Sequence, residues 1–324
     1  MLYENFDFRL YTKTQAGYFE LVNAVSDITY TTNRIGSAGK LEFKLLKTAP
    51  LSFFEGDMVT LYIDYMPIFK GYVFKKTKNE KGEISVVCYD QMRYLKANQS
   101  YAISGMTASD VLKRIAADFR LSLGEIEDTG YILPAYVEED MSLFDILART
   151  LAKTLIATVE MYVVYDSFGK LNLKSVRKMG VNYVIGDKSL ASGFEYTTSI
   201  DDETYNYIKI VRPNEATGGA DTYVYNDENS IGFWGMLQFY HKVDKDTNEA
   251  QIADLGGQLL NYHNKIWDTL NITCLGVLGL IAGHTIPIEI ADIGDIKRLV
   301  IDKCTHTFTG DNHTMSLELI TGGL

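Results

Sequence analysis

Three groups of polar residues have types and spacings that could support chemistry, and the first is a protease signature. Asp128-Thr129-Gly130 matches the short motif of aspartic proteases, whose mechanism needs two carboxylates that share one proton. The sequence holds no second copy, so the other carboxylate would have to come from a symmetric dimer. The flanking residues are typical of a turn, and we interpret the motif as a turn between two helices.

The second group is His306 and His313, with Asp311 between them. Two imidazoles and a carboxylate can bind a metal ion, but a spacing of seven residues matches no common set of ligands. The segment fits a hairpin loop between two strands. We predict no metal site and no cofactor site in this chain.

The third group consists of two acidic clusters, Asp201-Asp202-Glu203 and Glu138-Glu139-Asp140. A cell-wall hydrolase would need a pair of carboxylates across a cleft, or a Cys–His pair. Each cluster lies at the edge of an expected element and is typical of a solvated turn or cap. The sequence also lacks nucleophile-elbow, phosphate-loop and dinucleotide-loop motifs. We therefore predict no catalytic residue, and a hydrolase remains the alternative.

Length, composition and charge limit the classes of protein that this chain can be. Its 324 residues are 46% hydrophobic and 23% charged, which is typical of a globular chain of two to three domains. The net charge of −11 argues against a nucleic-acid coat, which needs a basic face. No secretory signal or membrane span is expected. Cys88, Cys274 and Cys304 form no CxxC motif and suit buried thiols in a reducing cytosol.

Alternating hydrophobicity predicts β-structure in residues 1–95. Residues 41–45 and 59–63 alternate apolar and polar side chains with a period of two, as half-buried strands do. Short turn sequences at 66–67 and 79–82 connect them to further strands. The pattern predicts an antiparallel meander, either a small barrel or a sandwich.

The middle of the chain, residues 96–195, changes to a mixed pattern. Apolar stripes with helical spacing follow cap residues at 107–119 and 142–155. A hairpin is expected over 161–175. These elements predict a small α+β domain.

Residues 196–324 return to β-structure around one helix, which is expected over 248–263. Gly256 and Gly257 lie inside that helix, where each costs about 1 kcal/mol relative to Ala. We therefore expect another element to pack closely against them.

A faint repeat links the two β regions. Residues 56–63 and 283–290 share a glycine followed by alternating apolar positions, and the next strands match in order. We infer an internal duplication. The predicted fold class is mainly β, with two antiparallel β-barrel domains and a small α+β insert between them.

Residues 231–236 form an apolar, glycine-flanked stretch that is a candidate for contact with a partner. Phe233, Trp234 and Met236 are the candidate residues, because aromatic side chains and Met are enriched at interfaces. Local core packing is the competing explanation. A sugar-binding face that uses Trp234 or Trp267 is a third.

A set of segments follows one another in a characteristic order: residues 56–59, 68–73, 86–95, 106–112, 162–166, 169–171, 205–209, His306 and 315–317. This order resembles that of a known family, the baseplate hub proteins of contractile-tailed phages and phage-tail-like bacteriocins. The family includes the late-control protein D and XkdQ/YqbQ-like hubs. No single motif is specific, so the resemblance rests on the ordered set, which spans nearly the whole chain.

The resemblance implies a structural role without chemistry. Hubs of this family are trimers with two tube-like β-barrel domains in each subunit, which together form a pseudo-sixfold ring. The ring joins the hexameric tail tube on one side to the trimeric central spike on the other. We thus expect a non-enzymatic homotrimer, made in the bacterial cytoplasm and assembled into a tail baseplate with tube, spike and other baseplate proteins. Neither membrane contact nor specific nucleic-acid binding is expected. The alternative is a cell-wall hydrolase or a hydrolase-associated tail protein.

The negative charge belongs almost wholly to the last region. Residues 1–95 hold 12 Lys or Arg and 11 Asp or Glu, a net charge of +1. Residues 96–195 hold 11 Lys or Arg and 13 Asp or Glu, a net charge of −2. Residues 196–324 hold 8 Lys or Arg and 18 Asp or Glu, a net charge of −10. We predict that part of this charge lines the axial channel or its rim and repels nucleic acid, with the candidates Asp201, Asp202 and Glu203. A solvated outer surface is the competing explanation.

Overall fold

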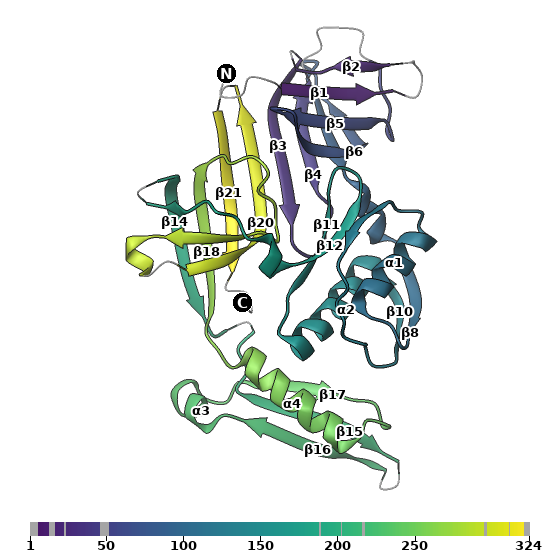
Figure 1. Ribbon diagram of the computed structural model, residues 1–324, viewed down its shortest axis with the longest axis vertical. Helices are drawn as coiled ribbons and strands as arrows, with labels where there is room; N and C mark the ends of the chain where they lie inside the picture. Colours follow the sequence, from purple (N-terminus) through teal and green to yellow (C-terminus); the bar gives the residue numbers. More distant parts are fainter. Residues whose placement is uncertain are drawn as a thin grey trace.

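The computed structural model describes residues 6–12, 17–22, 24–45, 52–187, 189–201, 203–215, 218–294, 297–310 and 312–320. Strands predominate, as predicted, and the described strands gather into one large sheet and three small ones (Figure 1). Within these residues, no helix is long and apolar enough to cross a membrane.

The first β region folds as its alternation predicts. Along β5, the side chains of Val59, Leu61 and Ile63 are fully buried. They share a core with Phe8 and Phe43, whose rings meet edge to face at 4.8 Å. The strands are β1 (Phe6–Tyr11), β2 (Tyr18–Glu20), β3 (Val25–Asn33), β4 (Lys40–Leu45), β5 (Met58–Ile63), β6 (Met66–Lys78) and β7 (Ile84–Tyr89).

The second β region does not form a separate barrel. One edge of β20 pairs with β21, and its other edge pairs first with β19 and then, over residues 303–308, with β3. The described strands of both regions therefore form one open thirteen-stranded sheet. The strands on this side of the sheet are β13 (Ile185–Gly186), β14 (Ala191–Ser199), β18 (Trp267–Leu275), β19 (Thr285–Glu289), β20 (Lys297–Thr309) and β21 (Asn312–Ile320). Of these, β13 and the start of β14 precede residue 196, where the sequence predicts that the second β region begins.

This open sheet corrects the prediction of two closed β-barrels. β20 is 13 residues long and extends well past β19, so its second half has backbone N–H and C=O groups that need partners. β3 supplies those partners. Sequence alternation indicates a strand but does not identify its neighbours, and it could not show this pairing.

The two halves of the predicted repeat occupy similar places in their regions. Residues 56–63 contain β5, and residues 283–290 contain β19, and each strand pairs with the long strand that follows it. Gly56 and Gly283 have φ angles of +87° and +95°, which favour glycine at both turns. Because short antiparallel meanders recur in unrelated proteins, the duplication stays a prediction.

The insert has the expected helices. In α1, Thr107 and Asp110 form a capping box, and in α2 the Ser142 hydroxyl accepts a hydrogen bond from the Asp145 N–H. The expected hairpin is also present. The elements are η1 (Gln91–Lys96), β8 (Asn98–Ile103), α1 (Ala108–Asp118), β9 (Leu123–Ile126), β10 (Tyr136–Ser142), α2 (Leu143–Thr158), β11 (Tyr162–Asp166), β12 (Leu171–Ser175) and η2 (Val176–Met179).

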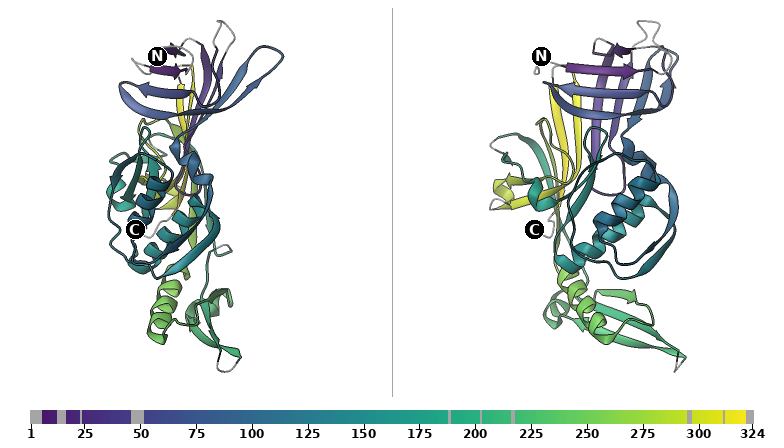
Figure 2. Two further views of the ribbon diagram at one scale, coloured as in Figure 1. Left: turned by 90° about the vertical axis from the view of Figure 1, so that its right-hand side faces the viewer. Right: turned by 45° about the vertical axis from the view of Figure 1, so that its right-hand side comes forward.

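After β14 the chain leaves the large sheet, and it returns with β18. The intervening residues form a two-layer unit at the end of the molecule opposite to β1 and β2 (Figures 1 and 2). Ile208 and Ile210 of its sheet pack on Ile252 and Leu259 of α4. Its elements are β15 (Tyr207–Asn214), β16 (Gly219–Asn226), α3 (Glu228–Trp234), β17 (Gln238–Lys242) and α4 (Glu249–His263), and η3 (Ala291–Ile293) follows later in the chain.

The two adjacent glycines of α4 make a matched pair for mutation. A Cβ on Gly256 would lie 2.1 Å from the ring of Tyr225, whereas a Cβ on Gly257 would meet nothing within 4 Å. The prediction of close packing is thus confirmed at Gly256, but it is wrong at Gly257. We expect Gly256→Ala to destabilise the protein by about 1–3 kcal/mol through overpacking. Gly257→Ala should stabilise it by about 1 kcal/mol. Urea unfolding of both variants measures this, and shifts of the same sign would contradict the packing described.

Candidate functional site

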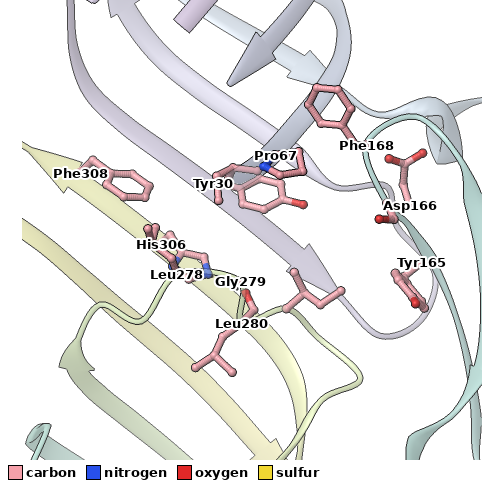
Figure 3. Close-up of a pocket in the computed structure, with 13 residues that line it drawn as sticks. Tyr30, Pro67, Tyr165, Asp166, Phe168, Leu278, Gly279, Leu280, His306 and Phe308 are labelled. Atoms are coloured by element: carbon pink, nitrogen blue, oxygen red, sulfur yellow. Dashed lines mark hydrogen bonds between the residues drawn. The ribbon is translucent and has the colours of Figure 1, made fainter. Parts of the chain in front are cut away.

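A cavity of about 120 Å³ lies where the two β regions and the insert meet (Figure 3). β3 and β20 form one side of it, and the turn after β11 and the loop at 278–281 close the other. Tyr30, Asp166, Phe168 and His306 are among the polar and aromatic side chains that line it. The site therefore draws residues from all three parts of the chain.

Asp166 ends β11 with its carboxylate beside this cavity. One oxygen accepts a hydrogen bond of 2.7 Å from the Gly169 N–H, while Oδ2 is buried without a hydrogen-bond partner among the described residues. The nearby Gln91 amide is bonded at both of its polar ends to the backbone of Ser122. Burial raises the pKa of Asp166 to about 6, although the Gly169 hydrogen bond, the Gln91 amide and the Lys70 ammonium lower it.

A second buried carboxylate, Asp90, joins the first β region to the insert. It accepts hydrogen bonds from the Gly39 N–H at 2.8 Å and from the Met92 N–H at 2.9 Å, and so caps η1. Burial, with the negative charge of Asp166, raises the pKa of Asp90 well above its usual range. A Cβ on Gly39 would lie 2.4 Å from this carboxylate, so only glycine fits there.

The turn after β11 docks the insert on the first β region. The Phe168 ring packs on the Tyr62 ring with centroids 4.8 Å apart, and the Lys70 Nζ lies 6.0 Å from the Phe168 centroid. On the opposite side, the Ala282 N–H donates a hydrogen bond of 2.9 Å to the Thr32 hydroxyl. These contacts hold the three regions in fixed positions around the cavity.

His306 lies on β20, and His313, the cross-strand partner of Phe308, lies on β21, so the strands reach further than the hairpin loop expected from the sequence. His306 Nε2 lies 2.7 Å from the Leu280 carbonyl oxygen, and His306 Nδ1 lies 2.9 Å from His313 Nε2. If Nε2 of His306 donates to the carbonyl, its Nδ1 accepts from His313. Burial lowers the pKa of both imidazoles, that of His313 to about 3.

The surroundings of the histidine pair are aromatic. The His306 ring stacks between Tyr30 and Phe308, at centroid distances of 6.2 and 6.3 Å. Asp311, the third candidate metal ligand, lies outside the described residues. Among those that are described, no three His, Cys, Asp or Glu side chains gather as metal ligands would.

The three cysteines are buried, as expected. Burial raises the pKa of each thiol, that of Cys274 to about 11. A thiol of this kind is protonated at neutral pH and is a poor nucleophile. The cavity itself is lined by one desolvated carboxylate, Asp166, and one imidazole with a lowered pKa, His306, and no cysteine is among the described residues that line it.

The protease signature forms a loop that braces α1. Asp128 Oδ1 accepts hydrogen bonds from the Ser109 hydroxyl at 3.1 Å and from the Gly130 N–H at 3.0 Å. Gly130 has a φ of +67°, which favours glycine. The motif lies in an irregular segment between α1 and α2, as the sequence predicts, and these contacts engage one oxygen of its carboxylate in local structure.

The acidic candidates lie near a second cavity, of about 270 Å³, between α2 and the start of β18. Glu203 lines it, and its carboxylate lies 3.7 Å from His263 Nδ1. Asp201 is exposed, and Asp202 lies outside the described residues. Trp267 also lines this cavity, where its Nε1 is buried without a hydrogen-bond partner among the described residues. A channel or rim position for the three carboxylates stays a prediction.

The partner candidates lie at the end of α3. The Phe233 and Met236 side chains are 86% and 60% exposed, and Trp234 is half-buried. Gly235, with a φ of +79°, ends the helix and turns the chain toward β17. Core packing does not account for Phe233 and Met236, and contact with a partner stays a prediction for all three residues.

Sequence reasoning missed Asp90 and Asp166 as a pair. Each has a local signal, since Asp90 precedes a short helix and Asp166 begins the turn Asp-Ser-Phe-Gly. These signals identify caps and turns. They do not show that two carboxylates 76 positions apart in the chain share one buried environment.

Comparison with known proteins gives a consistent set of relatives. A family model described as YQBQ-like matches residues 28–320. The uncharacterised protein YqbQ of Bacillus subtilis is 29% identical over 82% of this chain and 81% of the relative. The phage-like element PBSX protein XkdQ, also of B. subtilis, is 28% identical over 82% of each. The crystal structure of a 43 kDa tail protein of prophage MuSo2 from Shewanella oneidensis is similar in fold, with a TM-score of 0.71, 11% identity and 98% of both chains covered.

Proposed function

Because the chain belongs to the YQBQ-like family and shares the fold of a prophage tail protein, we propose that it is the structural hub of a tail baseplate. In this proposal, three copies form a ring that adapts a hexameric tail tube to a trimeric central spike. The tube protein binds one side of the ring, the spike protein binds the other, and further baseplate proteins surround it. The chain is made in the bacterial cytoplasm and has no catalytic role.

The open sheet is the observation that supports a ring most directly. Among the described strands, β14 pairs only with β18, so its other edge has unpaired backbone groups. β14 is nine residues long, with Glu195 as its one charged residue and no proline. Long, weakly charged edge strands are normally protected or paired with another chain. A neighbouring subunit would supply that partner.

The charge of the last region is consistent with the proposal of an acidic axial channel, through which nucleic acid would pass without binding to the wall. Three copies would bring together three regions of net charge −10, with Asp201, Asp202 and Glu203 at the channel or its rim. Carboxylates there would repel a polyanion within a Debye length of about 8 Å.

Light scattering after size exclusion tests the proposed assembly. We expect a single species of three times the monomer mass at micromolar concentration. A monodisperse monomer at high concentration would count against the hub. Zymography on purified cell wall tests the hydrolase alternative, which predicts a cleared band that is lost in Asp201→Asn or Glu203→Gln.

A further inference from the structure

The sheet of the two-layer unit has one face covered by α4 and one face open. Its strands lie in the order β16-β15-β17, and the register aligns Lys209 with Val224 on one side and with Tyr240 on the other. Since side chains alternate along a strand, these three lie on the face opposite to Ile208 and Ile210, which contact α4. We define the outer sheet face as Tyr207, Lys209, Val211, Thr222, Val224, Asn226, Gln238, Tyr240 and Lys242. Val211, on the central strand, is buried, and the exposed positions lie on β16 and β17.

The outer sheet face is apolar and cationic within an acidic unit. Val224 is 42% exposed and Tyr240 is 56% exposed, and the nine positions include two lysines and no carboxylate. Residues 200–266 as a whole hold 5 Lys or Arg against 11 Asp or Glu. The acidic residues of the unit therefore lie elsewhere, on its loops, its helices and the inner side of its sheet.

This distribution points to a particular kind of partner. Each copy of the chain has a net charge of −11, so two copies repel each other except where a surface lacks carboxylates. Lys209 and Lys242 would attract carboxylates of a neighbour, and Val224 and Tyr240 would bury apolar area against it. We propose that the outer sheet face contacts the acidic last region of a second copy of this chain. This inference rests on the proposed homotrimer and assigns one of its contact surfaces.

Nucleic acid is a poorer fit to the same face. Two lysines neutralise few phosphates, and the acidic remainder of the unit would repel a polyanion at longer range. The exposed apolar side chains of Val224 and Tyr240 would also stay in water against a phosphate backbone.

Two lysines three positions apart provide a matched test. Lys242 belongs to the outer sheet face, whereas Lys245 lies in the following loop, where its Nζ is 2.8 Å from Glu215 in an exposed ion pair. Lys242→Glu and Lys245→Glu change the charge of the same unit equally. Sedimentation should show that Lys242→Glu weakens self-association on the order of tenfold more than Lys245→Glu, and that high salt reduces the difference.

A photo-crosslinking amino acid in place of Tyr240 gives a direct readout. We expect irradiation to produce covalent dimers and trimers of the chain. The proposal is overturned if the wild type is trimeric but Tyr240 yields no such products and the two lysine variants assemble equally well. Crosslinks to DNA alone would overturn it too. A monomeric wild type would instead contradict the proposed hub itself, so the two failures are distinguishable.

Discussion

The buried imidazoles should each take stability from the protein as the pH falls from 7 to 5, because the fold holds them in the neutral form. Burial lowers the pKa of His263 and His306, and it lowers that of His284 to about 4 and that of His313 to about 3. In the unfolded chain each group has an ordinary pKa near 6.5. Below that pH the unfolded state binds more protons than the folded state, so the free energy of unfolding falls with pH.

The two most strongly shifted imidazoles set the size of this effect. His284 and His313 each contribute a loss of about 2 kcal/mol between pH 7 and pH 5, a large part of a typical stability of about 5–15 kcal/mol. Urea unfolding across this pH range measures the slope. His284→Gln is the test variant, since this side chain is only half-buried, and it should flatten the curve by about 2 kcal/mol. If the free energy of unfolding of this variant depended on pH as steeply as that of the wild type, the folded state would not hold His284 in the neutral form.

The second large effect has the opposite sign and comes from Asp166. Its folded pKa of about 6 lies above its unfolded value, so the folded state binds the extra proton between pH 4 and 6. Stability from this group is present at low pH and lost as the pH rises through 6. Asp166→Asn keeps an acceptor for the Gly169 N–H and removes the buried charge. We expect it to stabilise the protein by about 2–3 kcal/mol at pH 8 and to have little effect at pH 4.

Asp110 provides the control for this prediction. Its pKa is lowered, first by the hydrogen bond from the Thr107 backbone in the α1 capping box. Asp110→Asn should therefore lower the free energy of unfolding at neutral pH. The loss should be smaller in acid, because the wild-type carboxylate is then increasingly protonated. Thermal melts at pH 4 and pH 8 compare the two variants. If Asp166→Asn also destabilised the protein at pH 8, the Asp166 carboxylate would be stabilising in its charged form, contrary to its burial.

Local patterns predicted the elements of this fold much better than their pairing. The capping residues Thr107 and Ser142 and the apolar stripe of α4 identify three helices close to their observed bounds. The union of the two β regions depends on hydrogen bonds between residues 303–308 and β3, about 270 positions away in the chain. Backbone pairing of this kind leaves no periodic signal, so the prediction of closed barrels was wrong.

The same limit applies to the candidate site. Phe233 and Met236 were named as partner candidates from an apolar, glycine-flanked stretch with core packing as the alternative; both side chains are exposed, and contact with a partner stays a prediction. The outer sheet face was missed, since Lys209, Val224 and Tyr240 become neighbours only through strand register. The cavity at the junction was missed because Tyr30, Asp166 and His306 come from three segments that are far apart in the sequence and meet only in the folded chain.

Electron cryomicroscopy of the purified chain tests the proposed hub most directly. We expect a ring of three copies around an axial channel, with β14 of each copy at a subunit boundary and Asp201 and Glu203 at the channel or its rim. A threefold ring with those carboxylates on its outer wall and a neutral channel would leave the hub standing and contradict the acidic channel. Isolated monomers, or an assembly without threefold symmetry, would contradict the hub itself.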